Sequence, residues 1–289
     1  MLDDLYHFLD PTAFWLGSFP VRWYGLGYFF GLAIGAIVIL RTAKRWNLKF
    51  TLDSLLVIIL AATLGIIIGG RVGFILFYGN GYYFAHPLEI LAINNGGMSF
   101  HGGVIGMAVA VPIAARLTKI AFLTIADLVV IAAPIGIFLV RCANFINGEL
   151  WGAVTDLPWG VVFDDSGGGT LPRHPTQLYE ACLEGIVMFV VLQVLSRRKS
   201  ATSARGFHVG IFLCLYAIFR ISIEFVRQPD VQLGYLFGDW FTMGMLLSLP
   251  LLAGGIALVV YSQIAKKPQR GEPIVQMLAD SNDTLEGEE

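Results

Sequence analysis

Long apolar runs divide this chain, and polar or glycine-rich stretches separate them. Each run approaches the roughly 20 apolar residues that an α-helix needs to cross the hydrocarbon core of a bilayer. The runs cover residues 22–40, 54–77, 98–115, 122–141, 178–195, 207–226 and 240–261. The pattern therefore predicts an all-α polytopic membrane protein with seven transmembrane helices.

The polar remainder of the chain predicts two further regions. The connection 142–177 contains Trp151, Trp159 and Phe163, so it is too rich in aromatic residues for a plain linker. We expect it to form a small extracytoplasmic lobe of one seven-helix transmembrane domain, residues 1–262. The segment 263–289 is polar and ends in acidic residues, which is typical of a disordered tail.

Basic residues indicate the orientation of the predicted bundle. The connections that follow the first, third, fifth and seventh runs hold 13 of the 19 lysines and arginines. These are Arg41, Lys44, Arg45, Lys49, Arg116, Lys119, Arg197, Arg198, Lys199, Arg205, Lys266, Lys267 and Arg270. Because lysine and arginine accumulate in cytoplasmic loops, the N-terminus is predicted to lie outside and the C-terminus in the cytoplasm.

The composition excludes a single soluble domain. Hydrophobic residues make up 56% of the chain and charged residues only 14%, whereas a soluble domain carries about 25% charged residues. The odd number of cysteines, Cys142, Cys182 and Cys214, does not suggest a disulfide framework. No C-x-x-C motif or His/Cys cluster is present, so no metal site is predicted. The chain is also not expected to bind nucleic acid.

Six arginines remain once the cytoplasmic group is removed, and all lie within the runs or on the predicted outer side. They are Arg22, Arg71, Arg141, Arg173, Arg220 and Arg227. An arginine at the centre of a membrane helix costs about 2.5–3.5 kcal/mol on insertion scales. Because guanidinium binds phosphate in a bidentate way, the set suggests recognition of a phosphorylated group near the outer leaflet.

The alternative explanation for these arginines is ion pairing inside the bundle. Two candidate acids, Glu180 and Glu184, are four residues apart on one face of the fifth predicted helix, and Glu224 follows Arg220 by four. Asp127 and Glu149 are also available. Structural pairing accounts for some of the six, and the sequence leaves open how many.

Two segments combine glycines with polar side chains at predicted helix ends. Residues 96–103 (GGMSFHGG) place His101 between glycine pairs, where a histidine can act as a base or simply hydrogen-bond within a packed turn. Residues 141–152 (RCANFINGELWG) bring Arg141, Asn144 and Glu149 to the point where the fourth run ends. Such a density of polar groups there predicts a cavity-lining turn rather than an ordinary loop.

Two later segments repeat this combination. Residues 171–180 (LPRHPTQLYE) lead into the fifth predicted helix. Residues 216–230 (YAIFRISIEFVRQPD) place Tyr216, Arg220, Glu224 and Arg227 at spacings of four, four and three, and therefore on one helix face. This face should point into the bundle, either as a functional stripe or as a structural ladder of ion pairs.

Together with GGRVGF at 69–74, these segments resemble the bacterial prolipoprotein diacylglyceryl transferases across roughly residues 20–262. The resemblance implies a multi-pass enzyme of the cytoplasmic (inner) membrane with its active site toward the periplasm. Such an enzyme transfers the diacylglyceryl group of phosphatidylglycerol to the lipobox cysteine of a preprolipoprotein signal peptide. The products are a thioether and glycerol 1-phosphate, and no metal or organic cofactor is implied.

The resemblance also implies roles for individual residues. His101, Arg141 and Arg220 match the family's essential residues. A second group, expected to bind substrate, comprises Tyr24, Asn144, Glu149, Gly152, Tyr216, Glu224 and Arg227.

The chemistry of this reaction suits the same residues. A thiolate attacks a glycerol carbon while a phosphate leaves, which requires a base or electropositive surroundings and neutralisation of the leaving group. We therefore expect Arg141 and Arg220 at the phosphate, Arg227 as a supporting cation, and His101 as a base or substrate-positioning residue. The acids and the amide of the second group, Asn144, Glu149 and Glu224, are expected to hold the arginines.

Two other functions compete with this interpretation. A transporter of an anionic or phosphorylated solute could also line a bundle with arginines, although nearly all the unusual polar residues here gather on the predicted outer side. A metal-dependent phosphatidyl-group transferase is disfavoured because no matching acidic cluster is present.

Overall fold

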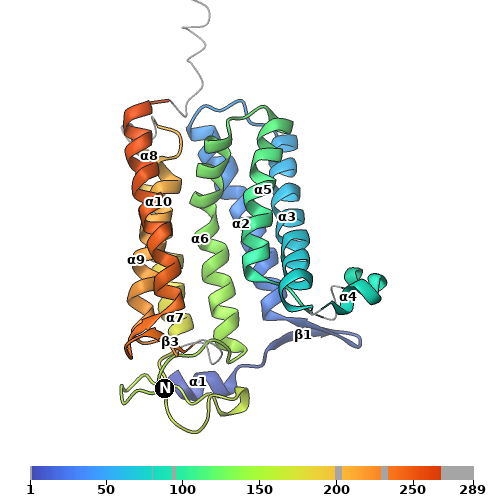
Figure 1. Ribbon diagram of the computed structural model, residues 1–289, viewed down its shortest axis with the longest axis vertical. Helices are drawn as coiled ribbons and strands as arrows, with labels where there is room; N and C mark the ends of the chain where they lie inside the picture. Colours follow the sequence, from blue (N-terminus) through green and yellow to red (C-terminus); the bar gives the residue numbers. More distant parts are fainter. Residues whose placement is uncertain (1, 80, 93–95, 199–203, 229–233, 268–289) are drawn as a thin grey trace, which may run out of the picture.

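The computed structural model describes residues 2–79, 81–92, 96–198, 204–228 and 234–267, and the side chains at 100 and 101 lie outside the described part. Long helices run side by side along the longest axis of the molecule (Figure 1). They are α2 (Trp23–Arg45), α3 (Leu52–Tyr78), α5 (Phe100–Thr118), α6 (Phe122–Ile146), α9 (Phe207–Glu224) and α10 (Met243–Ala265). One further helix is composite, made of α7 (Thr176–Glu180), the π-helix η4 (Ala181–Val187) and α8 (Met188–Arg197).

Six of the described helices are long and apolar enough to cross a membrane. They are α2, α3, α6, the composite helix, α9 and α10. The third predicted run coincides with α5, whose described apolar part, Gly102–Thr118, is shorter. The prediction of a helical bundle is therefore confirmed, with six candidate membrane spans among the described residues.

The prediction of an all-α fold is wrong in detail, because two small antiparallel hairpins are present. One pairs β1 (Thr12–Leu16) with β2 (Phe19–Arg22), and the other pairs β3 (Tyr235–Phe237) with β4 (Phe241–Thr242). Each strand is at most five residues long and aromatic, so it does not interrupt the apolar pattern enough to be recognised. The first hairpin turns at Gly17, which has φ +62°.

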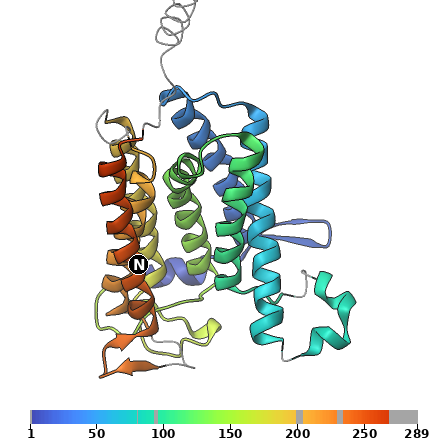
Figure 2. The same cartoon turned by 45° about the horizontal axis from the view of Figure 1, so that its top comes forward.

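Several short elements lie at the same end of the bundle as the first hairpin (Figure 1). They are the helix α1 (Leu2–Phe8), α4 (Tyr82–Ala85), η1 (Pro87–Leu91) and η3 (Asp164–Ser166). Figure 2 shows the β1–β2 hairpin and the α4 segment projecting sideways from the long helices.

Glycines bring α3 and α5 into direct backbone contact. Gly65, Gly69 and Gly73 recur every four residues on α3, and a Cβ added at Gly69 would collide with the carbonyl oxygen of Gly102. A Cβ on Gly73 would lie 2.7 Å from the Cα of Gly102. Small residues at this spacing allow membrane helices to approach closely. This part of α3 therefore packs directly against the backbone of α5.

A buried carboxylate fixes the start of α9 against α6. The fully buried Asp127 of α6 accepts hydrogen bonds from the backbone N–H groups of Gly206, at 2.7 Å, and Val209, at 2.8 Å. The first N–H groups of a helix have no partner within the helix, and a negative charge at this end is favourable. Asp127 therefore anchors the helix that carries Arg220.

The chain between α6 and α7 folds over one end of the bundle. Gly152 pairs with Arg227, and Arg173 pairs with Val154 and Val161, through isolated β-bridges. A small core of Tyr6, Phe145, Val161 and Phe163 joins this lobe to α1 and α6. Because α6 continues to Ile146, the first residues of the predicted lobe 142–177 belong to the helix.

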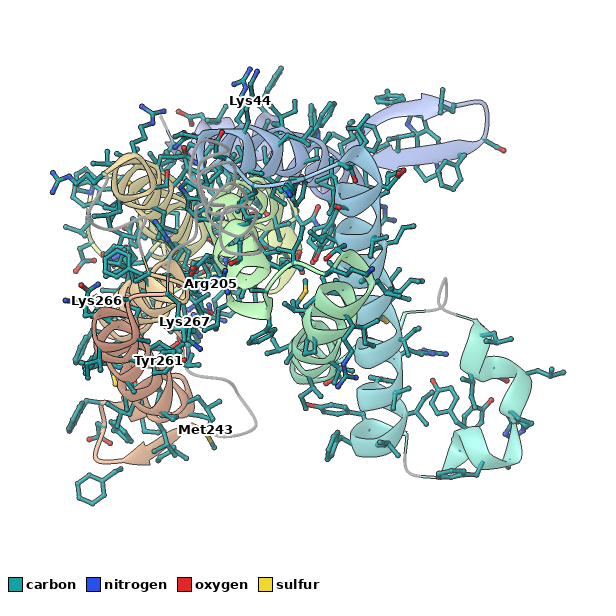
Figure 3. The ribbon with its side chains drawn as sticks, turned by 90° about the horizontal axis from the view of Figure 1, so that it is seen from above. Lys44, Arg205, Met243, Tyr261, Lys266 and Lys267 are labelled. Atoms are coloured by element: carbon teal, nitrogen blue, oxygen red, sulfur yellow. The ribbon has the colours of Figure 1, made fainter. Side chains whose placement is uncertain are left out.

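The opposite end of the bundle carries the basic residues. Viewed from that end, Figure 3 labels Lys44, Arg205, Lys266 and Lys267 near the helix termini. The predicted disordered tail, 263–289, begins inside α10, which continues to Ala265, and its residues 268–289 lie outside the described part.

Candidate active site

One buried carboxylate, that of Glu180 at the end of α7, joins three arginines. Its Oε1 accepts hydrogen bonds from Nη1 of Arg220, at 2.8 Å, and from Nη1 of Arg227, at 3.0 Å. Its Oε2 lies 2.8 Å from Nε of Arg141 on α6. The Glu180 side chain is fully buried, so the three guanidinium groups converge on a site closed to solvent on that side. Arg141 and Arg220, which the sequence analysis expects at the phosphate, thus share one buried carboxylate.

A second carboxylate, Glu224, supports two of the same arginines. Its Oε1 lies 2.6 Å from Nη2 of Arg220 and 3.8 Å from Nε of Arg227. The hydroxyl of Thr242 donates a hydrogen bond to the other oxygen at 2.6 Å. A Cβ on Gly244 would lie 2.6 Å from the Glu224 carboxyl group, so glycine is required for this approach of α10. The expected role of Glu224 in holding arginines is confirmed.

A third acid, Glu184, lies within the π-helix η4. It is fully buried, and its Oε2 is 3.9 Å from Nη2 of Arg141. Neither of its oxygens has a hydrogen-bond partner among the described residues. Single π-helical turns are frequently found at functional sites. With Glu184 ionised, the three arginines are balanced by three carboxylates, and with Glu184 neutral the cluster has one net positive charge.

Each of the three arginines has N–H donors without a partner among the described residues, and these could bind a ligand. Their side chains retain 19%, 17% and 11% exposure for Arg141, Arg220 and Arg227, whereas Glu180 and Glu184 have none. A guanidinium group carries five N–H donors, and the ion pairs described above use only some of them. The acids thus hold the arginines from the buried side, and the remaining donors suit the oxygens of a phosphate.

The expectation that Glu149 and Asn144 hold the arginines is wrong for the described contacts. The Nδ2 of Asn144 donates to Oε1 of Glu149 at 2.8 Å, and the Nδ2 of Asn147 donates to the same oxygen at 3.2 Å. The reason is the turn at Gly148, whose φ is +68° and which directs Glu149 back onto the end of α6. These residues therefore close the helix end beside Arg141.

Gly152 lets the lobe lie against the segment that carries Arg227. Its N–H donates to the carbonyl of His174 at 2.8 Å. A Cβ at this position would lie 2.5 Å from the carbonyl oxygen of Val226 and 2.7 Å from the Cβ of His174. Its role among the described residues is close packing rather than contact with the arginine side chains.

The two predicted tyrosines lie near the arginine cluster. Tyr24 on α2 lies near enough to Arg141 and Glu149 for their charges to act on its hydroxyl group. That hydroxyl is 3.3 Å from the hydroxyl of Tyr28. Tyr216 on α9 lies near enough to Glu184, Arg220 and Arg141 for their charges to act on its hydroxyl group. Both hydroxyls are thus near the site without being part of its ion pairs.

His101 belongs to the first turn of α5, but its side chain lies outside the described part of the chain. The backbone around it is held firmly. The Oγ of Ser99 accepts from the N–H of Gly102 at 3.2 Å, and the N–H of Ser99 donates to the carbonyl of Gly70 at 2.9 Å. The predicted meeting of His101 with Arg141 and Arg220 therefore stays a prediction.

Two of the six outlying arginines bind backbone carbonyls, so the structural role that the sequence left open for some of the set holds for these two, although their partners are carbonyls rather than acids. Arg71 donates to the carbonyls of Ile90, at 2.9 Å, and Gly96, at 2.7 Å, and also to those of Glu89 and Gly97. Arg173 donates to the carbonyls of Gly168 and Gly152. Both therefore stabilise irregular backbone by satisfying its acceptors.

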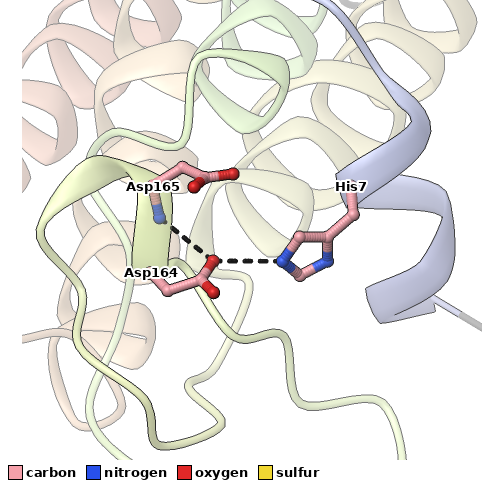
Figure 4. A group of neighbouring side chains, drawn as sticks. All are labelled: His7, Asp164 and Asp165. Atoms are coloured by element: carbon pink, nitrogen blue, oxygen red, sulfur yellow. Dashed lines mark hydrogen bonds and ion pairs between the residues drawn. The ribbon is translucent and has the colours of Figure 1, made fainter.

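Among the described residues, one group has the spacing of metal ligands, and it lies outside the arginine cluster. Figure 4 shows that His7 of α1 faces Asp164 and Asp165 of η3, with 3.1 Å between Nε2 of His7 and Oδ1 of Asp164. The pKa of His7 is raised by its hydrogen bond to the carbonyl of Asp3 and then by that to Asp164. The pKa of Asp164 is lowered, chiefly by the hydrogen bond from His7. These exposed groups tie α1 to the lobe.

Comparison with known proteins agrees with this arrangement. The family profile described as prolipoprotein diacylglyceryl transferase matches residues 11–261. A phosphatidylglycerol–prolipoprotein diacylglyceryl transferase of Nitratidesulfovibrio vulgaris is 47% identical over 87% of this chain and 94% of its own length. Proteins of the same name from Geobacter sulfurreducens (46% identical, over 87% and 95% of the two chains) and Rhizobium meliloti (47%, over 89% and 93%) are similarly close. The chain belongs to the prolipoprotein diacylglyceryl transferase family.

Proposed function

We propose that this chain transfers the sn-1,2-diacylglyceryl group from phosphatidylglycerol to the lipobox cysteine thiol of preprolipoproteins, the first step of lipoprotein maturation. The sulfur forms a thioether with the glycerol carbon, the C–O bond to phosphate breaks, and glycerol 1-phosphate leaves. The observation that carries the proposal is the convergence of Arg141, Arg220 and Arg227 on Glu180, in a chain whose family has this activity.

The geometry supports a division of labour within the cluster. Arg141 and Arg220 bind the phosphate and neutralise the charge that grows on the leaving oxygen, which is worth most in a site of low dielectric constant. Arg227 supplies a further positive charge. Glu180 and Glu224 fix these side chains in advance, so the site is not reorganised during the reaction.

The thiol proton needs an acceptor, and two features address this. The arginine cluster lowers the cost of a thiolate near it. His101 serves as the base or as a substrate-positioning residue. Of the residues expected to bind substrate, Tyr24, Tyr216 and Arg227 would contact it. Asn144, Glu149, Gly152 and Glu224 would act by holding the arginines, the end of α6 and the lobe in position.

The proposed topology places the cluster at the periplasmic side of the cytoplasmic (inner) membrane. In this topology α5 is the seventh span, the N-terminus is outside and the C-terminus is in the cytoplasm. The basic residues at the end of the bundle opposite to the lobe support this orientation. Residues 1–262 would then form the catalytic domain, with 142–177 as its extracytoplasmic lobe and 263–289 as a cytoplasmic tail. The partners are phosphatidylglycerol, the preprolipoprotein signal peptide and the bilayer.

A direct assay tests the proposal. The purified protein is incubated with phosphatidylglycerol and a lipobox peptide, and the peptide mass is measured. An increase equal to one diacylglyceryl group on the cysteine is expected. Conversion should be abolished in His101→Ala, Arg141→Ala and Arg220→Ala proteins that still insert into membranes. Near-normal conversion by Arg220→Ala would exclude the phosphate role, and transport of an anionic solute without any thioether product would favour the transporter.

A further inference from the structure

A second group of arginines lies at the other end of the bundle, around a groove between α2 and α8. The groove has a volume of about 440 Å³, within the range of small-molecule sites. On α2 it is lined by Val38, Arg41 and Arg45, and on α8 mainly by Val190, Val194 and Arg197. The chain thus combines an apolar wall with three guanidinium groups at one end of it.

The charge in this groove is uncompensated among the described residues that line it, because none of them is acidic. Arg45 is held in place by a hydrogen bond from its Nη1 to Oγ of Ser196, at 2.8 Å. A neutral donor also belongs to the lining, since Nε2 of Gln193 is buried and has no hydrogen-bond partner among the described residues. The groove therefore presents hydrogen-bond donors and positive charge, with no acidic side chain among its described lining residues.

This groove is separate from the arginine cluster at Glu180. Gln193 follows Glu180 by 13 residues along one continuous helix, which at 1.5 Å per residue corresponds to about 20 Å. The two sites therefore occupy opposite halves of the bundle, at depths that correspond to different leaflets of a bilayer about 30 Å thick.

We propose that this groove binds one anionic glycerophospholipid from the inner leaflet. The phosphate lies among Arg41, Arg45 and Arg197, and one acyl chain lies along Val38, Val190 and Val194. Charge complementarity supports an anionic headgroup, since basic pockets between membrane helices on the cytoplasmic side bind such headgroups. The adjoining apolar wall supports a lipid rather than a free phosphate ion, which would leave that wall uncovered.

Native mass spectrometry of the full-length protein in detergent tests this proposal. The probes are phosphatidylserine and phosphatidylcholine with identical acyl chains, so that only the headgroup charge differs. Each arginine near the surface contributes about 1 kcal/mol toward an anionic lipid, so Arg41→Gln/Arg197→Gln should bind one phosphatidylserine about thirtyfold more weakly than the unaltered protein. The matched control is Arg116→Gln/Arg198→Gln, which removes two exposed arginines that do not line the groove.

A second variant tests the apolar wall without changing charge. Val190 is 51% exposed, and Val190→Trp should fill the groove and also release the bound phosphatidylserine. Unchanged retention by the Arg41/Arg197 variant, equal retention of phosphatidylcholine by the unaltered protein, or equal loss in the control would overturn the proposal. Loss in the arginine variant with full retention in Val190→Trp would also overturn it, because the lipid would then bind outside the groove.

Discussion

The substitution Glu180→Gln tests the central role of this carboxylate. The amide has the same shape but no charge, and only one of its two terminal atoms can accept a hydrogen bond. If the oxygen stays with Arg220 and Arg227, the NH2 group lies about 2.8 Å from Nε of Arg141, so that two donors face each other. Removing one partner of a buried ion pair costs about 3–5 kcal/mol, and we expect a loss of this size in the free energy of unfolding.

The expected effect on catalysis follows from the same contacts. Arg141, which we assign to the phosphate, then loses its carboxylate partner, and a displacement of about 1 Å can lower a rate by about 10²-fold. Unfolding is measured by titration with sodium dodecyl sulfate in mixed micelles, and transfer is measured by peptide mass. Asp156→Asn, which neutralises an exposed carboxylate of the lobe, is the matched control.

Two outcomes would refute this reasoning. Unfolding of Glu180→Gln at the same detergent fraction as Asp156→Asn would show that Glu180 does not stabilise the bundle. A clear loss of stability with an undiminished transfer rate would show that the positions of the arginines do not limit the reaction.

Three further substitutions have defined outcomes. Arg141→Lys keeps the charge but loses the planar fork, so kcat should fall by about tenfold or more; full activity would reduce the role of Arg141 to plain charge. Gly152→Ala places a Cβ 2.5 Å from the carbonyl oxygen of Val226, so the free energy of unfolding should fall by about 1–3 kcal/mol. The control Gly254→Ala, whose Cβ meets no atom within 4 Å, should leave it unchanged. Equal unfolding midpoints for the two variants would contradict this. The raised pKa of His7 stabilises the fold fully below pH 6.5, and this contribution is lost as the pH rises through the raised value. Asp164→Asn should lower the pKa of His7, as followed by imidazole NMR signals, and an unchanged titration would disprove the contact.

The bundle was predictable because its helices are long and apolar. Each of the six candidate spans overlaps a run identified from the sequence, and their ends differ by a few residues. The hairpins were not predictable, because strands such as Tyr235–Phe237 are shorter than any periodicity that could be recognised. The π-helix Ala181–Val187 within the fifth predicted span could not be recognised from the sequence, because one extra residue in a helical turn does not change the apolar run.

The site was predictable in its arginines and less so in its acids. The spacing of Arg220, Glu224 and Arg227 predicted one helix face, which is wrong for Arg227, because α9 ends at Glu224 and Arg227 pairs with Gly152 beyond it. The ion pairs nevertheless bring the three side chains together. Glu180 was recognised only as a possible ion-pair partner. Its central position depends on how α6, α7 and α9 pack, which is information that one sequence does not contain. The signal that could have promoted it is a pair of acids four residues apart inside an apolar run.

The shared carboxylate of Glu180 also constrains how the protein enters the membrane. Arg141 on α6 is synthesised before Glu180, and Arg220 on α9 comes later still. An arginine at the centre of a membrane helix costs about 2.5–3.5 kcal/mol on insertion scales. The cost is smaller toward a helix end, where Arg141 lies, and the carboxylate partner lowers it further. Helix α6 should therefore stay beside the insertion machinery until α7 has emerged, so that the two helices leave for the lipid as a pair. The ion pairs of the mature site would thus set the order of biogenesis.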